Sequence, residues 1–142
     1  MQPQRRQCRI FVVDDEYVIA STTALILRHH GFDARFFTAP LDALHAARAE
    51  APDLLISDVV MPQLSGVELA LLVKAHCPAC QVLLFSGLTG RQDLLAMARA
   101  QGQEFDLLPK PVHPDALLSK IQFLIEHNSS LLAGRADLHP CL

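Results

Sequence analysis

The chain has 142 residues, of which 51% are hydrophobic and 19% charged, and it carries a net charge of −3 at pH 7. A chain of this length most simply forms one domain that buries about 68 to 70% of the surface of its unfolded state. The slightly negative charge provides no general attraction to nucleic acid. We therefore expect protein or small-ion partners and no nucleic-acid partner.

An N-terminal extension over residues 1–8 precedes the domain, which we expect to span residues 9–127. The apolar run at 10–13 is too short for an export signal or a membrane span. We therefore expect a cytoplasmic protein that makes no membrane contact. Cysteines in that compartment are usually reduced, which we expect for all four in this chain, Cys8, Cys77, Cys80 and Cys141.

Strand-forming runs alternate with segments of helical period along the domain. In chain order we expect a strand at 10–13, a helix at 18–30, a strand at 33–37, a helix at 40–49, a strand at 53–57, a helix at 67–76, a strand at 81–85, a helix at 92–100, a strand at 105–108 and a helix at 114–126. Gly31 is suited to end the first helix and Pro40 to begin the second. The remaining tail, 128–142, is too short and polar for an output domain.

Five rounds of strand and helix predict an α/β fold with a five-stranded parallel sheet covered by helices on both faces. The strands are nearly continuous apolar runs, as expected where both faces of a sheet are buried. The strand order typical of such a flavodoxin-like fold is 2-1-3-4-5.

Polar residues follow four of the five expected strands at the point where each strand ends. Asp14 and Asp15 follow the first strand, Asp58 the third, Ser86 the fourth and Lys110 the fifth. Ligands of open α/β sheets bind at this edge. Three carboxylates in one crevice require a cation, and Mg²⁺ fits best because it uses few protein carboxylates and retains other oxygen ligands.

A metal, a hydroxyl donor and a lysine around a carboxylate form a site that can accept a phosphoryl group. Asp58 is the candidate nucleophile, because it lies between the acidic pair and the two other side chains. Ser86 can donate a hydrogen bond, and Lys110 can neutralise a second oxygen. Taken alone, each motif also has a plain structural use, such as helix capping for the acidic pair.

These residues together resemble the receiver domain of two-component response regulators, over about Arg9 to Glu126. The resemblance is carried by Val13-Asp14-Asp15-Glu16, Asp58-Val59-Val60-Met61-Pro62 with Gly66, Ser86-Gly87 and Lys110-Pro111. It implies that Asp58 accepts a phosphoryl group from a histidine kinase or a histidine phosphotransfer protein. The protein would then be a phosphoacceptor in signalling and not a conventional enzyme.

The resemblance also implies roles for the neighbouring residues. Mg²⁺ would be held by Asp15, Asp58 and the backbone carbonyl of Val60, with Asp14 assisting through water. Ser86 and Lys110 would contact the phosphoryl group, and the bond between Lys110 and Pro111 would be cis.

One position departs from the family pattern and affects the expected output. Three residues before the lysine, where the family often has Tyr or Phe, this chain has Leu107. Phe105 lies on the same face of the expected strand and is a candidate substitute, although a core role suits it better. The usual docking face for a downstream protein is formed by the fourth helix, fifth strand and fifth helix, where Leu94, Leu95, Met97, Leu107 and Leu124 lie.

Three other interpretations compete with a phosphorylated receiver. The chain could be a receiver-like interaction module that is not phosphorylated. The loop at 86–90 suggests a flavin or nucleotide binder, but such a loop belongs after the first strand, where this chain has acids. An Asp-nucleophile phosphatase needs two aspartates two positions apart, whereas Asp14 and Asp15 are adjacent.

Cys77 and Cys80 follow a helix C-terminus, so we expect a packed turn and not a redox pair.

Overall fold

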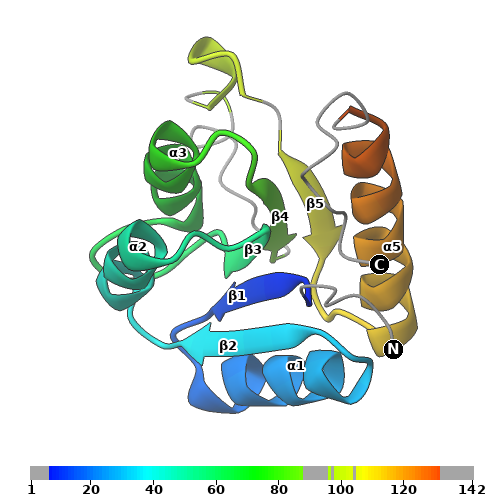
Figure 1. The fold of residues 1–142 in the computed structure, drawn as a ribbon. Coiled ribbons are helices and arrows are strands. Elements are labelled where there is room, and N and C mark those ends of the chain that lie inside the picture. The colour runs from blue at the N-terminus through cyan, green and yellow to red at the C-terminus, as the bar shows by residue number, and fades with distance from the viewer. Residues whose placement is uncertain (1–6, 88–95, 97, 104, 132–142) are drawn as a thin grey trace.

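The computed structural model describes residues 7–87, 96, 98–103 and 105–131. Its strands are β1 (Arg9–Val13), β2 (Asp33–Phe37), β3 (Leu54–Asp58), β4 (Gln81–Ser86) and β5 (Asp106–Pro109). Its helices are α1 (Tyr17–His29), α2 (Pro40–Ala49), α3 (Gly66–His76) and α5 (Pro114–Leu131). All five strands lie in one sheet in the order β2-β1-β3-β4-β5, and each pairs with its neighbours in parallel (Figure 1). The predicted architecture is therefore confirmed.

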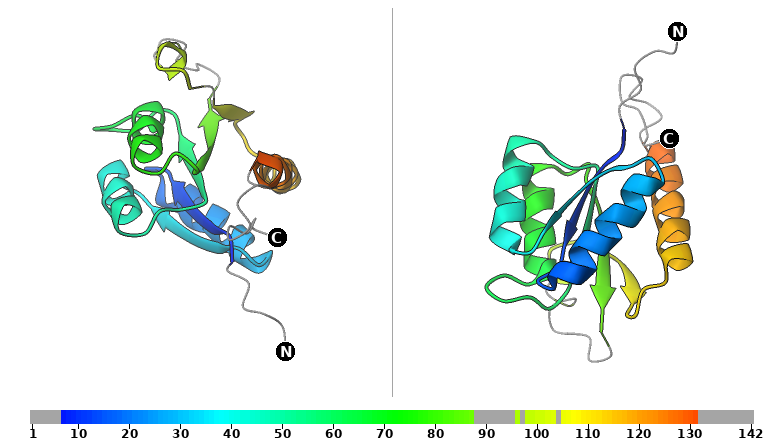
Figure 2. Two further views of the ribbon diagram at one scale, coloured as in Figure 1. Left: turned by 45° about the horizontal axis from the view of Figure 1, so that its top comes forward. Right: turned by 90° about the horizontal axis from the view of Figure 1, so that it is seen from below.

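Helices cover both faces of the sheet, with α1 and α5 on one side and α2 and α3 on the other (Figure 2). The strand sequences explain this, because successive side chains of a strand point to opposite faces. On β1, Phe11 and Val13 belong to the core under α2 and α3, whereas Ile10 and Val12 belong to the core under α1 and α5. Each face of the central strands is thus buried, which is why these strands show no apolar–polar alternation.

The register of the sheet brings the carboxyl ends of four strands to one edge. Val13 of β1 lies opposite Ser57 of β3, and Asp58 lies opposite Phe85 of β4. Ser86 lies opposite Pro109 of β5. The residues that follow these positions therefore share one edge of the sheet.

One helix runs well past its expected end, and another cannot be compared with the expectation. The last helix continues to Leu131, past the predicted end at 126 and past the domain boundary predicted at 127. No glycine or proline occurs between Pro114 and Gly134, so the sequence contains no strong stop signal there. The helix predicted at 92–100 falls largely outside the described residues. Within the described part of the chain, no helix is both long and apolar enough to cross a membrane.

The cysteine pair after α3 forms a packed turn, as expected. Cys77 ends α3, its carbonyl accepts a hydrogen bond from the backbone N–H of Cys80, and both thiols are free. Burial raises the pKa of the Cys80 thiol to about 12, so this thiol is not activated. The expectation of a reduced thiol is wrong for Cys8, which is disulfide-bonded. The cellular compartment alone does not reveal which thiols a fold brings together.

Candidate functional site

Asp58 lies at the end of a strand that is buried along its whole length. Every residue of β3 is buried, and the side chain of Asp58 itself is only 12% exposed. Its backbone carbonyl accepts a hydrogen bond from Ser57 Oγ at 2.9 Å, and the next backbone N–H, that of Val59, donates to the carbonyl of Phe85 at 3.0 Å. The peptide group that follows the Cα atom of Asp58 is therefore fixed by hydrogen bonds at both its carbonyl and its N–H.

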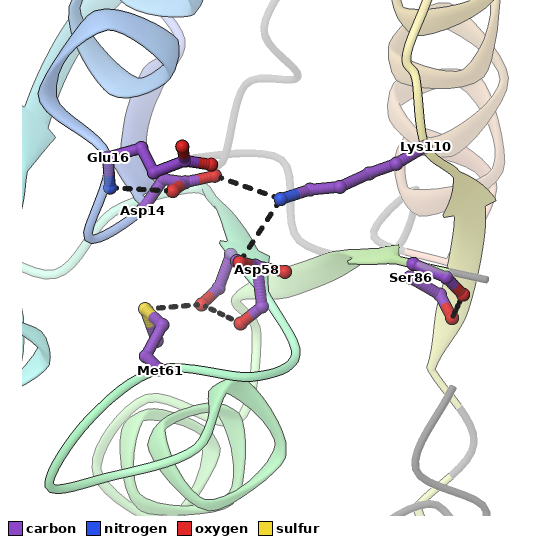
Figure 3. Close-up of polar contacts among 8 residues, drawn as sticks. Asp14, Glu16, Asp58, Met61, Ser86 and Lys110 are labelled. Carbon is purple, nitrogen blue, oxygen red and sulfur yellow. Dashed lines mark hydrogen bonds and ion pairs between the residues drawn. The ribbon is translucent and has the colours of Figure 1, made fainter. Parts of the chain in front are cut away.

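Lys110 connects Asp58 to the acidic pair that follows β1. Its Nζ atom lies 3.1 Å from Asp58 Oδ2 and 3.4 Å from Asp14 Oδ2 (Figure 3). Lys110 comes from the loop after β5, where its backbone N–H donates to the carbonyl of Ser86 at 2.8 Å. The bond between Lys110 and Pro111 is cis, the isomer that the resemblance implied. A cation is thus fixed between two carboxylates that come from different strands.

Asp14 is almost fully buried, at 1% exposure, and both of its carboxylate oxygens have partners. Oδ1 accepts the backbone N–H of Glu16 at 2.9 Å, while Oδ2 faces Lys110. Burial raises the pKa of the Asp14 carboxyl, and the nearby charge of Asp58 raises it further. The hydrogen bond from Glu16 and the charge of Lys110 oppose that increase without cancelling it.

The same environment raises the pKa of Lys110. Burial lowers the pKa of its ammonium group, but the hydrogen bond to Asp58 and the charges of Asp14 and Asp58 outweigh that effect, so the pKa is raised. Lys110 therefore stays charged at neutral pH and partly neutralises the acids around it.

Three carboxylates come together at this edge as predicted. Asp14, Asp15 and Asp58 each offer one oxygen atom, and these atoms all lie within 4.8 Å of one another. Asp15, unlike the other two, is exposed to solvent. Carboxylate oxygens are the ligands that hard divalent cations prefer, so the residues present fit a magnesium ion.

The loop between β3 and α3 is fixed by interactions that the sequence analysis did not use. The N–H of Gly66 donates to the carbonyl of Val59 at 2.8 Å. Ser65 caps α3: its hydroxyl accepts the N–H of Glu68, and the Glu68 side chain accepts the N–H of Ser65, each at 3.0 Å. The Ser-x-x-Glu pattern of this capping box was visible in the sequence.

Gly66 is required at its position because it packs directly against the backbone of Asp58. A Cβ atom there would collide with the carbonyl oxygen of Asp58 and would lie 2.9 Å from its carbonyl carbon and from Ser57 Oγ, closer than real Cβ contacts allow. The glycine thus lets the start of α3 lie against the end of β3. The sequence suggested that Gly66 belongs to the motif, but not that Asp58 is the residue it contacts.

The other predicted site residues take different positions in the structure. Ser86 donates its hydroxyl to the carbonyl of Gly87 at 3.3 Å and lies apart from the acids and the lysine (Figure 3). Val60 follows Asp58 in the loop with an exposed side chain. Leu107 on β5 is exposed, whereas Phe105 is partly buried and packs against the core under α2 and α3.

Comparison with known proteins decides the family. The response regulator receiver domain family matches residues 10–122, which is most of the chain and includes every residue of the cluster. The chain belongs to the response regulator receiver domain family. Receiver domains are modules of two-component signalling proteins, and members of this family typically bind Mg²⁺ at an acidic cluster like the one described above.

Relatives of this receiver domain are response regulators of greater length. It is 34% identical over 119 residues to the DNA-binding transcriptional regulator NtrC of Proteus hauseri, covering 83% of this chain and 24% of that protein. It is also 34% identical over 119 residues to the transcriptional regulatory protein CreB of Escherichia coli, covering 82% and 50%. This chain therefore spans half or less of the length of these relatives.

Solved structures agree with the fold at the level of single receiver domains. A response regulator receiver domain protein from Clostridium thermocellum has a TM-score of 0.76 at 27% identity, covering 87% of this chain and 98% of its own. NtrX from Brucella abortus has a TM-score of 0.77 at 29% identity, covering 94% of this chain and 30% of its own.

Proposed function

We propose that this receiver domain is a phosphorylation-switched signalling module in which Asp58 accepts the phosphoryl group. The observation that carries the proposal is the position of Asp58 between a cation and two further acids. Its carboxylate lies 3.1 Å from Lys110 Nζ and within reach of any cation that Asp14 and Asp15 bind. A carboxylate in such a place has both a nucleophilic oxygen and nearby positive charge to stabilise the transferred group.

The donor in this proposal is a phosphohistidine on a histidine kinase or a histidine phosphotransfer protein. An Asp58 oxygen attacks phosphorus and forms a new P–O bond while the P–N bond to the donor imidazole breaks. The imidazole keeps the electron pair of that bond and takes up a proton. Lys110 pairs with a phosphoryl oxygen, because its ammonium group already faces Asp58.

Magnesium would be held by Asp15, Asp58 and the backbone carbonyl of Val60, with Asp14 acting through water. When bound, it supplies positive charge that offsets the charge on the phosphoryl oxygens. Asp14 suits an indirect role, because Glu16 and Lys110 already occupy its two oxygens. Asp15 suits a direct one because it is exposed at the rim of the cluster.

Ser86 would couple phosphorylation of Asp58 to a structural change in the rest of the domain. Its hydroxyl faces the Gly87 carbonyl, and rotation about χ1 moves it between staggered positions. In the phosphorylated domain the hydroxyl would donate to a phosphoryl oxygen in place of that carbonyl. Leu107, exposed on the adjacent strand, would transmit the change through packing, while Phe105 serves the core.

A downstream protein would dock on the surface that includes β5 and α5. Leu107 is exposed there, but Leu124 is buried and so is excluded from this surface. Leu94, Leu95 and Met97 lie outside the described residues. DNA binding is named for NtrC and other longer relatives, and for this chain we propose output through protein contact, given its net charge of −3.

The proposal is tested by intact mass after incubation with acetyl phosphate, with Mg²⁺ or with a chelator. We expect one phosphoryl adduct that requires Mg²⁺ and that Asp58→Asn loses. Asp42→Asn, an exposed acid in the first turn of α2, is the control and should keep the adduct. A folded wild-type protein without an adduct in any condition would favour the unphosphorylated interaction module.

Flavin or nucleotide binding and phosphatase activity have less support at this edge of the sheet. Flavin or nucleotide binding needs a phosphate-accepting loop after β1, where Asp14 and Asp15 repel phosphate. The suggestive loop at 86–90 lies partly outside the described residues. Steady turnover of a general phosphomonoester would favour a phosphatase, whereas a single slowly hydrolysed adduct would favour the receiver function.

A further inference from the structure

Ser57 places a hydroxyl group inside an apolar part of the core. Its side chain is fully buried, and its neighbours across the sheet, Val13 of β1 and Leu84 of β4, belong to the core under α2 and α3. A buried hydroxyl that makes no hydrogen bond is destabilising, whereas alanine would fill much of the same space without that penalty. The partner of this hydroxyl therefore shows what the serine does.

The hydroxyl of Ser57 holds the backbone at the point where the chain leaves β3. It donates to the carbonyl of Asp58 at 2.9 Å, while the more distant Met61 Sδ lies 4.0 Å away. The same oxygen atom lies against Gly66, where an added Cβ would be 2.9 Å from it. Ser57 thus fixes the end of β3 against the start of α3.

Three hydrogen bonds fix the two peptide groups on either side of the Cα atom of Val59. The first is the bond from Ser57 to the carbonyl of Asp58. The N–H of Val59 donates to the carbonyl of Phe85 at 3.0 Å, and the carbonyl of Val59 accepts the N–H of Gly66 at 2.8 Å. Only the bond from Ser57 comes from a side chain, so a substitution can remove it while the other two backbone partners remain.

We propose that Ser57 is a positioning residue for the carbonyl of Val60, the backbone ligand of Mg²⁺ in the function proposed above. This inference rests on that proposed function. Mg²⁺ requires near-ideal octahedral geometry with short bonds to oxygen, so a ligand on a loosely held backbone binds it poorly. Ser57 does not touch the ion in this proposal. It acts through the fixed backbone between residues 58 and 60.

The carboxylate of Asp58 is positioned by a separate interaction. Its Oδ2 atom pairs with Lys110 Nζ at 3.1 Å, and the backbone N–H of Lys110 donates to the carbonyl of Ser86. Removal of the Ser57 hydroxyl should therefore weaken the metal site more than it disturbs the nucleophile. The two effects can be measured apart, as the affinity for Mg²⁺ and as the labelling rate at saturating Mg²⁺.

The test is titration calorimetry of Mg²⁺ into the full chain and two variants. Ser57→Ala should raise the dissociation constant for Mg²⁺ about three- to tenfold, the range expected for one neutral hydrogen bond. The Mg²⁺ concentration that gives half-maximal labelling by acetyl phosphate should rise by the same factor, and the rate at saturating Mg²⁺ should fall by less. Ile56→Val, the matched control, removes one buried carbon atom from the other face of β3. It should lower the unfolding temperature and leave the affinity for Mg²⁺ unchanged.

Two further measurements separate positioning from a general loss of stability. Ser57→Thr keeps the hydroxyl and suits a strand, so the folded variant should bind Mg²⁺ within about twofold of the wild type. In the metal-free protein, the amides of Val59 and Gly66 should exchange hydrogen about tenfold faster in Ser57→Ala than in the wild type. The amides of the central strand β1 should change much less, because the expected opening is confined to the loop after β3.

The outcomes that overturn this inference differ from those that overturn the proposed function. Equal Mg²⁺ affinity of the wild type and Ser57→Ala would mean that the hydroxyl does not position the ligand. A folded Ser57→Thr that binds as weakly as Ser57→Ala, or unchanged exchange at Val59 and Gly66, would lead to the same conclusion. A wild-type protein that binds no Mg²⁺ would instead contradict the metal site of the proposed function, and this inference with it.

Discussion

Replacing Gly66 with alanine tests how closely the phosphoacceptor strand and α3 must pack. The added Cβ would collide with the carbonyl oxygen of Asp58, and it would lie 2.9 Å from the carbonyl carbon of Asp58 and from Ser57 Oγ, whereas carbon atoms in contact are about 3.5 to 4.0 Å apart. The backbone must therefore move by at least about 1 Å, because a carbonyl cannot rotate away as a side chain can. Overpacking of this kind lowers the free energy of unfolding by up to about 3 kcal/mol. The better helix propensity of alanine offsets about 1 kcal/mol of that loss.

The net loss of about 2 kcal/mol corresponds to a fall in Tm of roughly 4 to 8 °C for a domain of this size. A displacement of Asp58 by about 1 Å should also slow acetyl phosphate labelling, by as much as a hundredfold. Gly87→Ala is the control, since a Cβ at Gly87 meets nothing within 4 Å. Equal unfolding temperatures and equal labelling rates for the two variants would refute the close-packing argument.

Three other perturbations follow from contacts in the site. Ser65→Ala should lower the free energy of unfolding by about 1 kcal/mol, measured in urea, because α3 loses its cap; Glu68→Gln keeps the reciprocal bond, so equal losses would contradict the capping role. Without metal, wild-type stability should fall as pH rises above the ordinary carboxyl pKa of 3.8 and through the raised pKa of Asp14, since the folded state holds that proton more tightly than the unfolded state. Asp14→Asn should remove this loss, and identical pH profiles of the urea midpoint would count against it. Lys110→Met should lower stability in chelator by about 1 to 3 kcal/mol by leaving two buried acids unpaired; Mg²⁺ should then raise Tm more than in wild type, and an equal response would contradict the pairing.

Much of the fold was predictable because local signals agree with the tertiary structure. The second strand and second helix have the predicted bounds, Asp33–Phe37 and Pro40–Ala49. Pro40 fixes the start of that helix through its own backbone geometry. The end of α5 was not predictable in the same way, because no glycine or proline near 126 forces a stop.

The site was predictable as a set of strand ends but not as a set of contacts. Parallel strands place their carboxyl ends at one edge, so Asp14, Asp58 and Lys110 had to lie near one another. Which acids Lys110 would contact depends on side-chain geometry that no sequence pattern encodes. The same holds for Ser86, whose hydroxyl faces the Gly87 carbonyl and not the cluster.

The difference between the two neighbouring acids leads to a last prediction about the metal. Asp14 is buried and both of its oxygens have protein partners, whereas Asp15 is exposed at the rim of the same cluster. Direct coordination by Asp14 would compete with Lys110 for Oδ2, whereas coordination by Asp15 competes with no ion pair seen among the described residues. We therefore expect Asp15→Asn to weaken Mg²⁺ binding about tenfold or more, and Asp14→Asn to weaken it less.

Titration calorimetry of Mg²⁺ into each variant measures this difference directly. Asp33→Asn, which changes an acid that pairs with Arg9 away from the cluster, is the control and should bind like wild type. A larger loss for Asp14→Asn than for Asp15→Asn would mean that Asp14 leaves Lys110 to bind the ion. Lys110 would then be released when the metal arrives, so the ion pair with Asp14 would belong only to the metal-free domain.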